Sequence, residues 1–549
     1  MVLAAAMAFC AYLFVWTLGT QPTIGDEARH FRRAVNYFEA PLPYYRVAYD
    51  PDYPAGQPGA IPYYDTSLWH EILALGWKAF GHVSFTLAQV YHLVFFFGLI
   101  VFTYLVGREL FGERGGLWSA GLVATCPINL FLGMAFYREI PMLALLAAAL
   151  YFLICRRPVL VGMALGGAYL MKGATAAAMM PPLFLIVFLQ IGSTWRQRVL
   201  RTLLMAAVAL AAILPDTYWR VRHFQAPIMF RYYAPTPYPP VLAHLYAQHP
   251  SPPVGAIPWS IFDPWLVAQL LGPTGLLVLG FGSVLGVYLL LKRVMAGASG
   301  WRAGGWAAAA AALTAKEAAP VWLLAPPIVA YTAIFATLLP GAYDVRYLQP
   351  ITLFAGLLAG GLLGSRKILA YEGRRKALVR GAGWLLVAAM VGQALAVPWV
   401  VHDRRRLSPE VEAAMQWIQA NVPQHARILY LEENLTAITA RPIVWAATAP
   451  HLFFEADEPQ QVQILKCLGV SYIAVHPTRR CDAVVPGTIP TAYPRTWLRT
   501  LPGRPYLERV YPMGDVGDTE GRFLLYRIDY AKVPPDWLTS PDLKQAGAC

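Results

Sequence analysis

The sequence predicts an α-helical polytopic membrane protein with about 11–13 transmembrane helices and a small C-terminal α/β domain outside the cytoplasm. Of the 549 residues, 57% are hydrophobic and 14% are charged, and the mean hydropathy is +0.45. Soluble domains carry roughly 25% charged residues, so an ordinary soluble protein is excluded. The net charge of +13 does not indicate nucleic-acid binding, because the basic residues form short clusters between apolar runs, without a zinc-finger, RNP or basic-helix pattern.

The long apolar runs are the candidate membrane spans. A bilayer core about 30 Å thick requires about 20 apolar residues per helix. The first run lacks a basic n-region and an A-x-A site, so we expect a retained span and not a cleaved signal peptide. Segment 303–319 is expected to lie as a helix on the cytoplasmic surface. The candidate spans are residues 3–20, 86–106, 117–134, 141–155, 159–171, 174–191, 202–217, 264–291, 320–340, 348–364 and 382–401.

The basic residues of the short loops predict the orientation, because such residues concentrate on the cytoplasmic side. One set of loops holds seventeen of them, and the short loops on the other side hold three, Arg138, Lys172 and Arg346. We therefore expect an inner (plasma) membrane protein with a cytoplasmic N-terminus and a periplasmic or extracellular C-terminal domain. The seventeen are Arg108, Arg114, Arg156, Arg157, Arg196, Arg198, Arg201, Lys292, Arg293, Arg302, Lys316, Arg366, Lys367, Arg374, Arg375, Lys376 and Arg380.

Residues 1–404 form the predicted transmembrane domain, with two long outer loops. The first loop, 21–85, carries amphipathic helices. The second loop, 218–263, is rich in aromatic residues and proline. Its aromatic side chains either line an acceptor site or belong to the interfacial aromatic belt; they include Tyr218, Trp219, Tyr232 and Tyr233.

Residues 405–549 are predicted to form the outer α/β domain. Ser408 followed by Pro409 is a good helix start, because serine caps the helix and proline fits its first turn. An amphipathic helix to about residue 420 and a second helix at 458–468 alternate with strand-like segments at 427–431, 471–475 and 522–528. Cys467 and Cys481 lie in this domain, either as a disulfide or as two thiols.

Isolated charged side chains gather at the predicted outer face. As drawn, the spans hold no Asp, Glu, Lys or Arg deep in the bilayer, which argues against an ion-coupled transporter. The outer charges come from four separate segments. These are Asp26 and Glu27 after the first span, Arg138 and Glu139 between two spans, and Lys172 and Arg346 in two further turns.

Each of these charges also has an ordinary explanation. Asp26 suits a solvated loop, Lys172 can extend to the membrane interface, and Arg346 can pair with Asp344. Asp26 and His30 lie one helical turn apart, which leaves a shared divalent metal open; no other cofactor is indicated. Together, carboxylates and cations on one membrane face suit a reaction between a lipid phosphate and a hydroxyl. A carboxylate would accept the hydroxyl proton, and cations would stabilise the phosphate.

Several motifs resemble the GT-C membrane glycosyltransferases, in particular the protein O-mannosyltransferases and the lipid A aminoarabinose transferases. They cover roughly the first 370 residues. Asp26-Glu27 matches the acidic motif that this family has after its first span. The others are residues 66–69 (TSLW), 79–81 (AFG), 106–114 (VGRELFGER), 137–141 (YREIP), 172–173 (KG) and 346–350 (RYLQP).

The resemblance implies a GT-C-like fold and the inverting transfer of a monosaccharide from a polyprenyl-phosphate donor. The acceptor would be a hydroxyl of a lipid, glycan or protein at the outer face, among membrane lipids and without nucleic acid. Asp26 would act as general base, supported by Glu27 and Glu139. Donor phosphate would be bound by Lys172, Arg346 and Arg138, and substrate by His30, Asp65 and Tyr347.

The chain departs from the family pattern in two places. Asp65-Thr66-Ser67 replaces a basic residue and Pro-Pro, and Glu139 stands where many relatives have Asp. Two other functions remain open. A polysaccharide ligase or polymerase with a lipid-pyrophosphate donor would use outer arginine and histidine residues such as Arg220, Arg222 and His223. A non-enzymatic lipid or glycan transporter would need polar residues along a central path, and the spans have few.

Overall fold

The structure is a computed structural model of the whole chain. It describes residues 2–39, 68–189, 194–224, 272, 280, 295, 323–331, 349–364, 373–431, 434–445, 453–454, 456–476, 478, 480–481, 493–512 and 522–538. Four predicted features lie wholly or mostly outside these residues: the spans at 264–291 and 320–340, the surface helix at 303–319, and the second outer loop.

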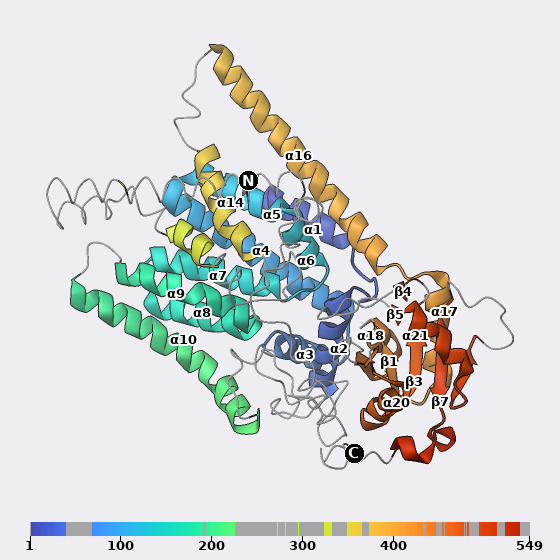
Figure 1. The fold of residues 1–549 in the computed structure, drawn as a ribbon. Helices are drawn as coiled ribbons and strands as arrows, with labels where there is room; N and C mark the ends of the chain where they lie inside the picture. Colours follow the sequence, from blue (N-terminus) through green and yellow to red (C-terminus); the bar gives the residue numbers. More distant parts are fainter. Residues whose placement is uncertain are drawn as a thin grey trace.

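The N-terminal part of the molecule is a bundle of helices (Figure 1). Helix α4 packs against α5 and α7, and α8 packs against α7 and α10. In chain order the helices are α1 (Val2–Val15), α2 (Gly25–Glu39), α3 (Leu68–Phe80), α4 (Phe85–Phe111), α5 (Glu113–Thr125), α6 (Pro127–Met134), α7 (Glu139–Ile154), α8 (Pro158–Met171), α9 (Gly173–Leu189), α10 (Trp195–Phe224), α14 (Gln349–Leu363) and α16 (Gly373–Arg405).

Several of these helices have the length and composition of membrane spans. Within the described part of the chain, α4, α10 and α16 are long and apolar enough to cross a bilayer, and the pair α5–α6 is a fourth if counted as one span. Five shorter apolar helices accompany them, within α1, α7, α8, α9 and α14. The chain is therefore a multi-pass membrane protein, and the total of about 11–13 spans stays a prediction.

The predicted span at 117–134 corresponds to a bent pair of helices, because α5 and α6 meet at an angle of 57°. Pro127 begins α6 and has no backbone N–H to donate into a continuing helix. The residue before a proline also avoids the helical region, and Cys126 is extended, with φ −60° and ψ 121°.

Small residues bring the central helices into close contact. Gly116 of α5 faces Gly107 of α4, where an added Cβ would come within 2.8 Å of the Gly116 Cα. Gly360 of α14 lies directly against the backbone of Ser119 in α5. Such small-residue contacts let membrane helices approach closely.

The described part of segment 21–85, the predicted first outer loop, contains the helices α2 and α3. α2 and α3 pack against each other. On α2, apolar residues such as Ala34 and Val35 are buried beside the polar residues His30 and Arg33. The buried face of α2 therefore carries polar and charged side chains as well as apolar ones, and these polar side chains are candidate site residues.

The C-terminal domain is a five-stranded sheet with helices on both faces, in the strand order β2-β1-β3-β7-β6. β1 pairs in parallel with β2 and β3, and β7 pairs antiparallel with β3 and β6. The main elements are α17 (Pro409–Asn421), β1 (Arg427–Tyr430), α18 (Asn434–Thr439), β2 (Ile443–Trp445), α20 (Glu458–Cys467), β3 (Val470–Val475), α21 (Arg495–Thr500), β6 (Leu507–Tyr511) and β7 (Leu524–Ile528).

Two hydrophobic cores lie on opposite faces of this sheet. α17 contributes Val411 and Ile418 to one core, and α20 contributes Val462 and Leu465 to the other. The predicted cap is confirmed, since the Ser408 hydroxyl accepts a hydrogen bond of 3.3 Å from the Val411 N–H. Both helices and the strands at 427–431, 471–475 and 522–528 are confirmed. The side chains of Cys467 and Cys481 lie outside the described part, so their pairing stays a prediction.

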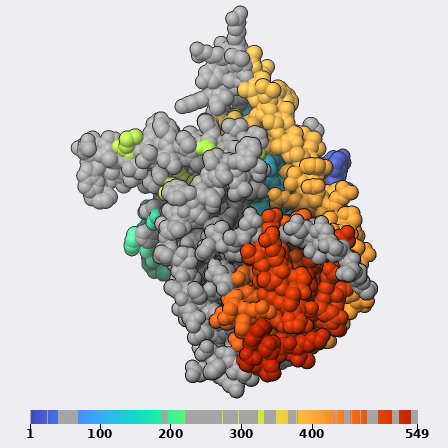
Figure 2. All heavy atoms as spheres, turned by 45° about the vertical axis from the view of Figure 1, so that its right-hand side comes forward, coloured from blue at the N-terminus to red at the C-terminus, as the bar shows by residue number. Residues whose placement is uncertain are grey.

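The C-terminal domain forms one body next to the end of α16 (Figure 2). Only Arg406, Leu407 and Ser408 separate Arg405, the last residue of α16, from α17. The domain also reaches back to the first outer loop, because α18 packs against α2. The helix that carries Asp26 and Glu27 therefore lies between the helical bundle and the C-terminal domain, which the sequence predicts to lie outside the cytoplasm.

Candidate functional site

A short turn between α6 and α7 contains or lies next to several of the predicted site residues, including Arg138, Glu139 and His30. It covers residues 135–138, and its Phe136 is fully buried with a left-handed backbone, φ 61°. A non-glycine residue rarely takes this conformation, which costs about 1–3 kcal/mol and is common at functional sites. The Phe136 ring packs against Trp69 of α3 and His92 of α4. The surrounding helices therefore hold the turn in a strained shape.

Glu139 begins α7 directly after this turn and forms a buried ion pair with Lys172. Lys172 is the residue at which α8 ends, and its extended backbone breaks the helix there. The side chains of Lys172 and Glu139 are 11% and 3% exposed. Because burying one such charge alone is costly, each of the two stabilises the other in place. The structure thus brings together two residues that the sequence placed in separate turns.

His30 is buried on α2 and contacts His70 of α3. Their ring nitrogens Nδ1 and Nε2 are 3.2 Å apart, so one ring donates to the other. Tyr137 lies edge-on to His30, with ring centroids 6.5 Å apart. Burial lowers the pKa of His30 well below its usual value, and the nearby Arg138 guanidinium lowers it further. His30 is therefore neutral and adjoins the 135–138 turn.

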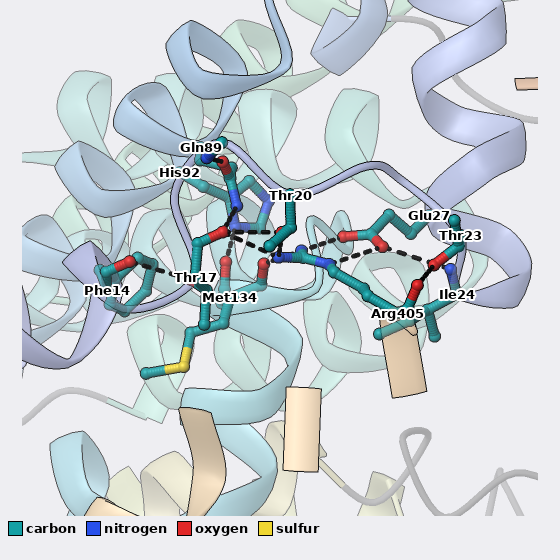
Figure 3. A network of polar contacts seen from close by, with 12 residues as sticks. Phe14, Thr17, Thr20, Thr23, Ile24, Glu27, Gln89, His92, Met134 and Arg405 are labelled. Atoms are coloured by element: carbon teal, nitrogen blue, oxygen red, sulfur yellow. Dashed lines mark hydrogen bonds and ion pairs between the residues drawn. The ribbon is translucent and has the colours of Figure 1, made fainter. Parts of the chain in front are cut away.

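Glu27 is completely buried and pairs with Arg405, the last residue of α16 (Figure 3). Arg405 Nε donates to Glu27 Oε2 at 3.1 Å, and Nη2 donates to Glu27 Oε1. Glu27 also accepts a hydrogen bond of 3.4 Å from the Ile24 N–H, which caps the start of α2. Burial raises the pKa of Glu27 to about 7, and Arg405 acts in the opposite direction.

Asp26 differs from Glu27 although it is the adjacent residue. It is partly exposed in the first turn of α2, where the positive end of the helix dipole favours a carboxylate. Successive helical residues point about 100° apart, so only one of the pair can face Arg405. Glu27 takes that position. Asp26 is the more exposed member of the pair.

Three predicted site residues, Asp65, Arg346 and Tyr347, lie outside the described residues. Gln349, two residues after Tyr347, begins α14 and is fully buried. Arg138 is buried at the start of α7. The structure therefore brings Arg138, Glu139, Lys172 and His30 around one turn, with Asp26 and Glu27 on the same helix as His30.

Sequence reasoning missed two residues of this region, Arg405 and His70. Arg405 belongs to the run HDRRR at 402–406, directly after the last span on the predicted outer side. Three arginines in a row directly after a predicted span are unusual, because the short loops on that side hold few basic residues, so a signal existed. His70 gave no signal, since a single histidine in an apolar helix is common.

A divalent metal was left open for Asp26 and His30. Among the residues that the structure describes, no group of three or more His, Cys, Asp or Glu side chains could hold a metal ion. His30 Nδ1 faces the His70 ring, and Arg138, Arg33 and Arg29 all act on His30 as positive charges. These surroundings favour an anion over a cation, and metal dependence stays a prediction.

Known proteins resemble this chain in part of its sequence and in its fold. A family model described as dolichyl-phosphate-mannose-protein mannosyltransferase matches residues 68–219. This segment contains α3 to α9, the 135–138 turn, Glu139 and Lys172. Among the curated proteins, none matches this sequence at a significant level.

Three solved structures are similar to the whole chain. The oligosaccharyltransferase AglB of Archaeoglobus fulgidus, in complex with an inhibitory peptide and a dolichol-phosphate, is 12% identical with a TM-score of 0.57, over 97% of this chain and 74% of that one. ArnT of Cupriavidus metallidurans, bound to undecaprenyl phosphate, is 15% identical with a TM-score of 0.55, over 97% and 99%. The arabinofuranosyltransferase AftD of Mycobacteria is 15% identical with a TM-score of 0.51, over 96% of this chain and 40% of its own length. At such identities the likeness shows the fold.

Proposed function

Since the chain has the fold of the GT-C membrane glycosyltransferases and resembles the mannosyltransferase family and ArnT, we propose that it transfers a monosaccharide from a polyprenyl-phosphate donor to a hydroxyl acceptor. The transfer takes place at the outer face of the membrane and inverts the anomeric centre. One observation carries the proposal: a buried carboxylate–lysine pair, a neutral histidine and a buried arginine surround one strained turn. That set suits a phosphate leaving group.

Asp26 is the general base in this proposal. A hydroxyl is a weak nucleophile unless a base accepts its proton as the new bond forms. Asp26 is partly exposed, whereas Glu27 and Glu139 are buried in ion pairs with Arg405 and Lys172 and are shielded from a reactant. Glu27 and Glu139 therefore act in supporting roles, Glu27 by fixing α2 and Glu139 by orienting Lys172.

Lys172, Arg346 and Arg138 bind the donor phosphate. They stabilise the negative charge that develops on the phosphate as the sugar departs. Lys172 ends α8 with its ammonium group already oriented by Glu139. His30, Asp65 and Tyr347 contact the sugar or the acceptor. His30 supports this role because a neutral imidazole can both donate and accept a hydrogen bond.

The test is transfer from a radiolabelled polyprenyl-phosphate monosaccharide by purified protein in membrane vesicles, comparing Asp26→Asn with wild type. Asparagine keeps the size of the side chain and removes its basicity, so donor binding should persist while turnover falls by about 100-fold or more. Asp403→Asn is the matched control, because Asp403 is an exposed carboxylate in the last turn of α16. It should keep wild-type turnover.

Two outcomes would contradict the proposal. Transfer that requires a polyprenyl-pyrophosphate donor would assign the chain to the ligases or polymerases. Undiminished turnover of both Asp26→Asn and Glu27→Gln would remove the catalytic role of α2.

A further inference from the structure

Arg405 is a buried charged side chain to which the proposed chemistry gives no role. Its guanidinium has five N–H donors, and each has an acceptor. Nε and one Nη2 hydrogen reach Glu27, and the other Nη2 hydrogen reaches the Met134 carbonyl. Nη1 donates to the Thr17 carbonyl at 3.1 Å and to the Thr20 hydroxyl at 2.8 Å. No donor remains for a substrate, so any role in transfer is indirect.

The acceptors of Arg405 come from three separate parts of the chain (Figure 3). Thr17 and Thr20 belong to the segment that connects α1 to α2, and Glu27 lies in the first turn of α2. Met134 ends α6, directly before the strained turn at 135–138. The Thr23 hydroxyl also donates to the Arg405 carbonyl at 2.8 Å, which binds the same connection a second time. Arg405 thus fixes the start of α2 and the 135–138 turn, which precedes Glu139, relative to each other.

The position of Arg405 in the chain extends this connection to the outer domain. Three residues after it, Ser408 caps α17, the first helix of that domain. From the same domain, α18 packs against α2. The outer domain therefore contacts α2 directly through α18 and holds it indirectly through Arg405.

We propose that Arg405 is a positioning residue, which places Asp26 of α2 and the 135–138 turn in the geometry for transfer and links that geometry to the outer domain. This inference rests on the proposed function. The five donors of Arg405 are used by Glu27, Met134, Thr17 and Thr20. Arg405 therefore acts through Glu27 and the Met134 carbonyl. A small misplacement of reacting groups is enough to lower a rate about 100-fold, so fixing two motifs together has a direct effect on turnover.

The test compares Arg405→Lys with wild type. Lysine keeps the charge but replaces a planar set of five donors by a single ammonium group. Turnover per folded molecule should fall by about 10- to 100-fold, while the KM for donor changes less than about threefold, because the phosphate-binding residues remain. Arg404→Lys is the matched control, since the neighbouring Arg404 is exposed and contacts the Phe131 ring. It should keep wild-type turnover.

A second measurement does not depend on activity. Hydrogen–deuterium exchange in Arg405→Lys should rise in both residues 25–39 and residues 134–139, and stay unchanged in the sheet of the outer domain. If Arg405→Lys does not fold, Glu27→Gln serves instead, because it keeps the shape and removes the charge on the other side of the pair. Its exchange should rise in residues 25–39, and its turnover should fall in the same way.

The outcomes separate the two proposals. Wild-type protein that transfers no sugar, together with increased exchange in both segments, would contradict the proposed function and leave the structural link intact. Wild-type turnover per folded molecule in Arg405→Lys would overturn the positioning role. So would increased exchange confined to the residues next to position 405.

Discussion

His30 illustrates at the residue scale how buried surroundings determine charge. It is fully buried, and four groups facing it, Arg138, His70, Arg33 and Arg29, disfavour its protonated form. The unfolded chain exposes the same imidazole to water, where its pKa is about 6.5. The folded protein therefore keeps His30 neutral at pH values where the unfolded chain binds a proton.

This difference predicts a pH dependence of stability. Because the folded-state pKa of His30 is depressed, its contribution is fully present above about pH 6.5 and is lost as the pH falls below it. The slope for one proton is about 1.4 kcal/mol per pH unit. Thermal unfolding in detergent between pH 7.5 and 5 should show a steeper loss of stability for wild type than for His30→Gln. His402→Gln, at an exposed position, should keep the wild-type slope; equal slopes in all three proteins would contradict the prediction.

At the element scale, the helical bundle depends on close approach as well as on apolar area. Gly360 of α14 and Gly364, the residue after its end, lie against Ser119 and Gly115 of α5, and Gly361 of α14 lies against Phe111 at the end of α4. Lipid chains are as apolar as leucine, so burial alone drives little association of helices inside a bilayer, and packing contributes more. The position of α14 matters for the site because it begins at Gln349, three residues after Arg346.

We predict that Gly360→Ala destabilises the protein. A Cβ at this position would overlap the backbone nitrogen and Cα of Ser119, and overpacking of this kind costs about 1–3 kcal/mol. Gly392→Ala is the matched control, because nothing lies within 4 Å of the added Cβ and alanine favours a helix by up to about 1 kcal/mol. The midpoint of thermal unfolding should therefore fall for the first variant and stay or rise for the second. A shift of equal sign in both would show that the contact between α5 and α14 is not tight.

At the scale of the whole molecule, the outer domain, α16 and α2 form one connected unit. α16 ends at Arg405, and α17 starts the C-terminal sheet domain within a few residues. α18 then returns to pack on α2. This arrangement requires the outer domain and the Asp26-Glu27 motif to lie on the same side of the membrane.

The orientation of that unit is the prediction at this scale. The charge difference between the two sets of short loops, seventeen against three, places the C-terminal domain outside the cytoplasm. A reporter enzyme that is active only in the cytoplasm, fused after Cys549, should give no signal. The same reporter fused after Arg156, in a predicted cytoplasmic loop, should be active. Strong activity of the C-terminal fusion would overturn the orientation.

Local patterns predicted a large part of the fold and some of the site. Apolar runs gave the helices, because 20 such residues match the bilayer regardless of what they pack against. Ser408-Pro409 gave the start of α17, and alternation gave three strands. Patterns failed where the signal was short or hidden. β2 has three residues, β6 lies at the sheet edge and is only partly buried, and the bend at Pro127 lies inside an apolar run that looks continuous.

For this protein, the sequence by itself determined the membrane class, the helical segments, the C-terminal α/β domain and the candidate acids Asp26, Glu27 and Glu139. Each of these follows from residue types and spacings within about 20 positions. The tertiary structure decided which acid each partner takes. Glu27 meets Arg405 across 378 positions and Glu139 meets Lys172 across 33, because helix packing sets these distances and chain spacing does not. Which of two adjacent acids stays accessible depends on the side of α2 that is buried, and packing against α3, α18 and Arg405 determines that side.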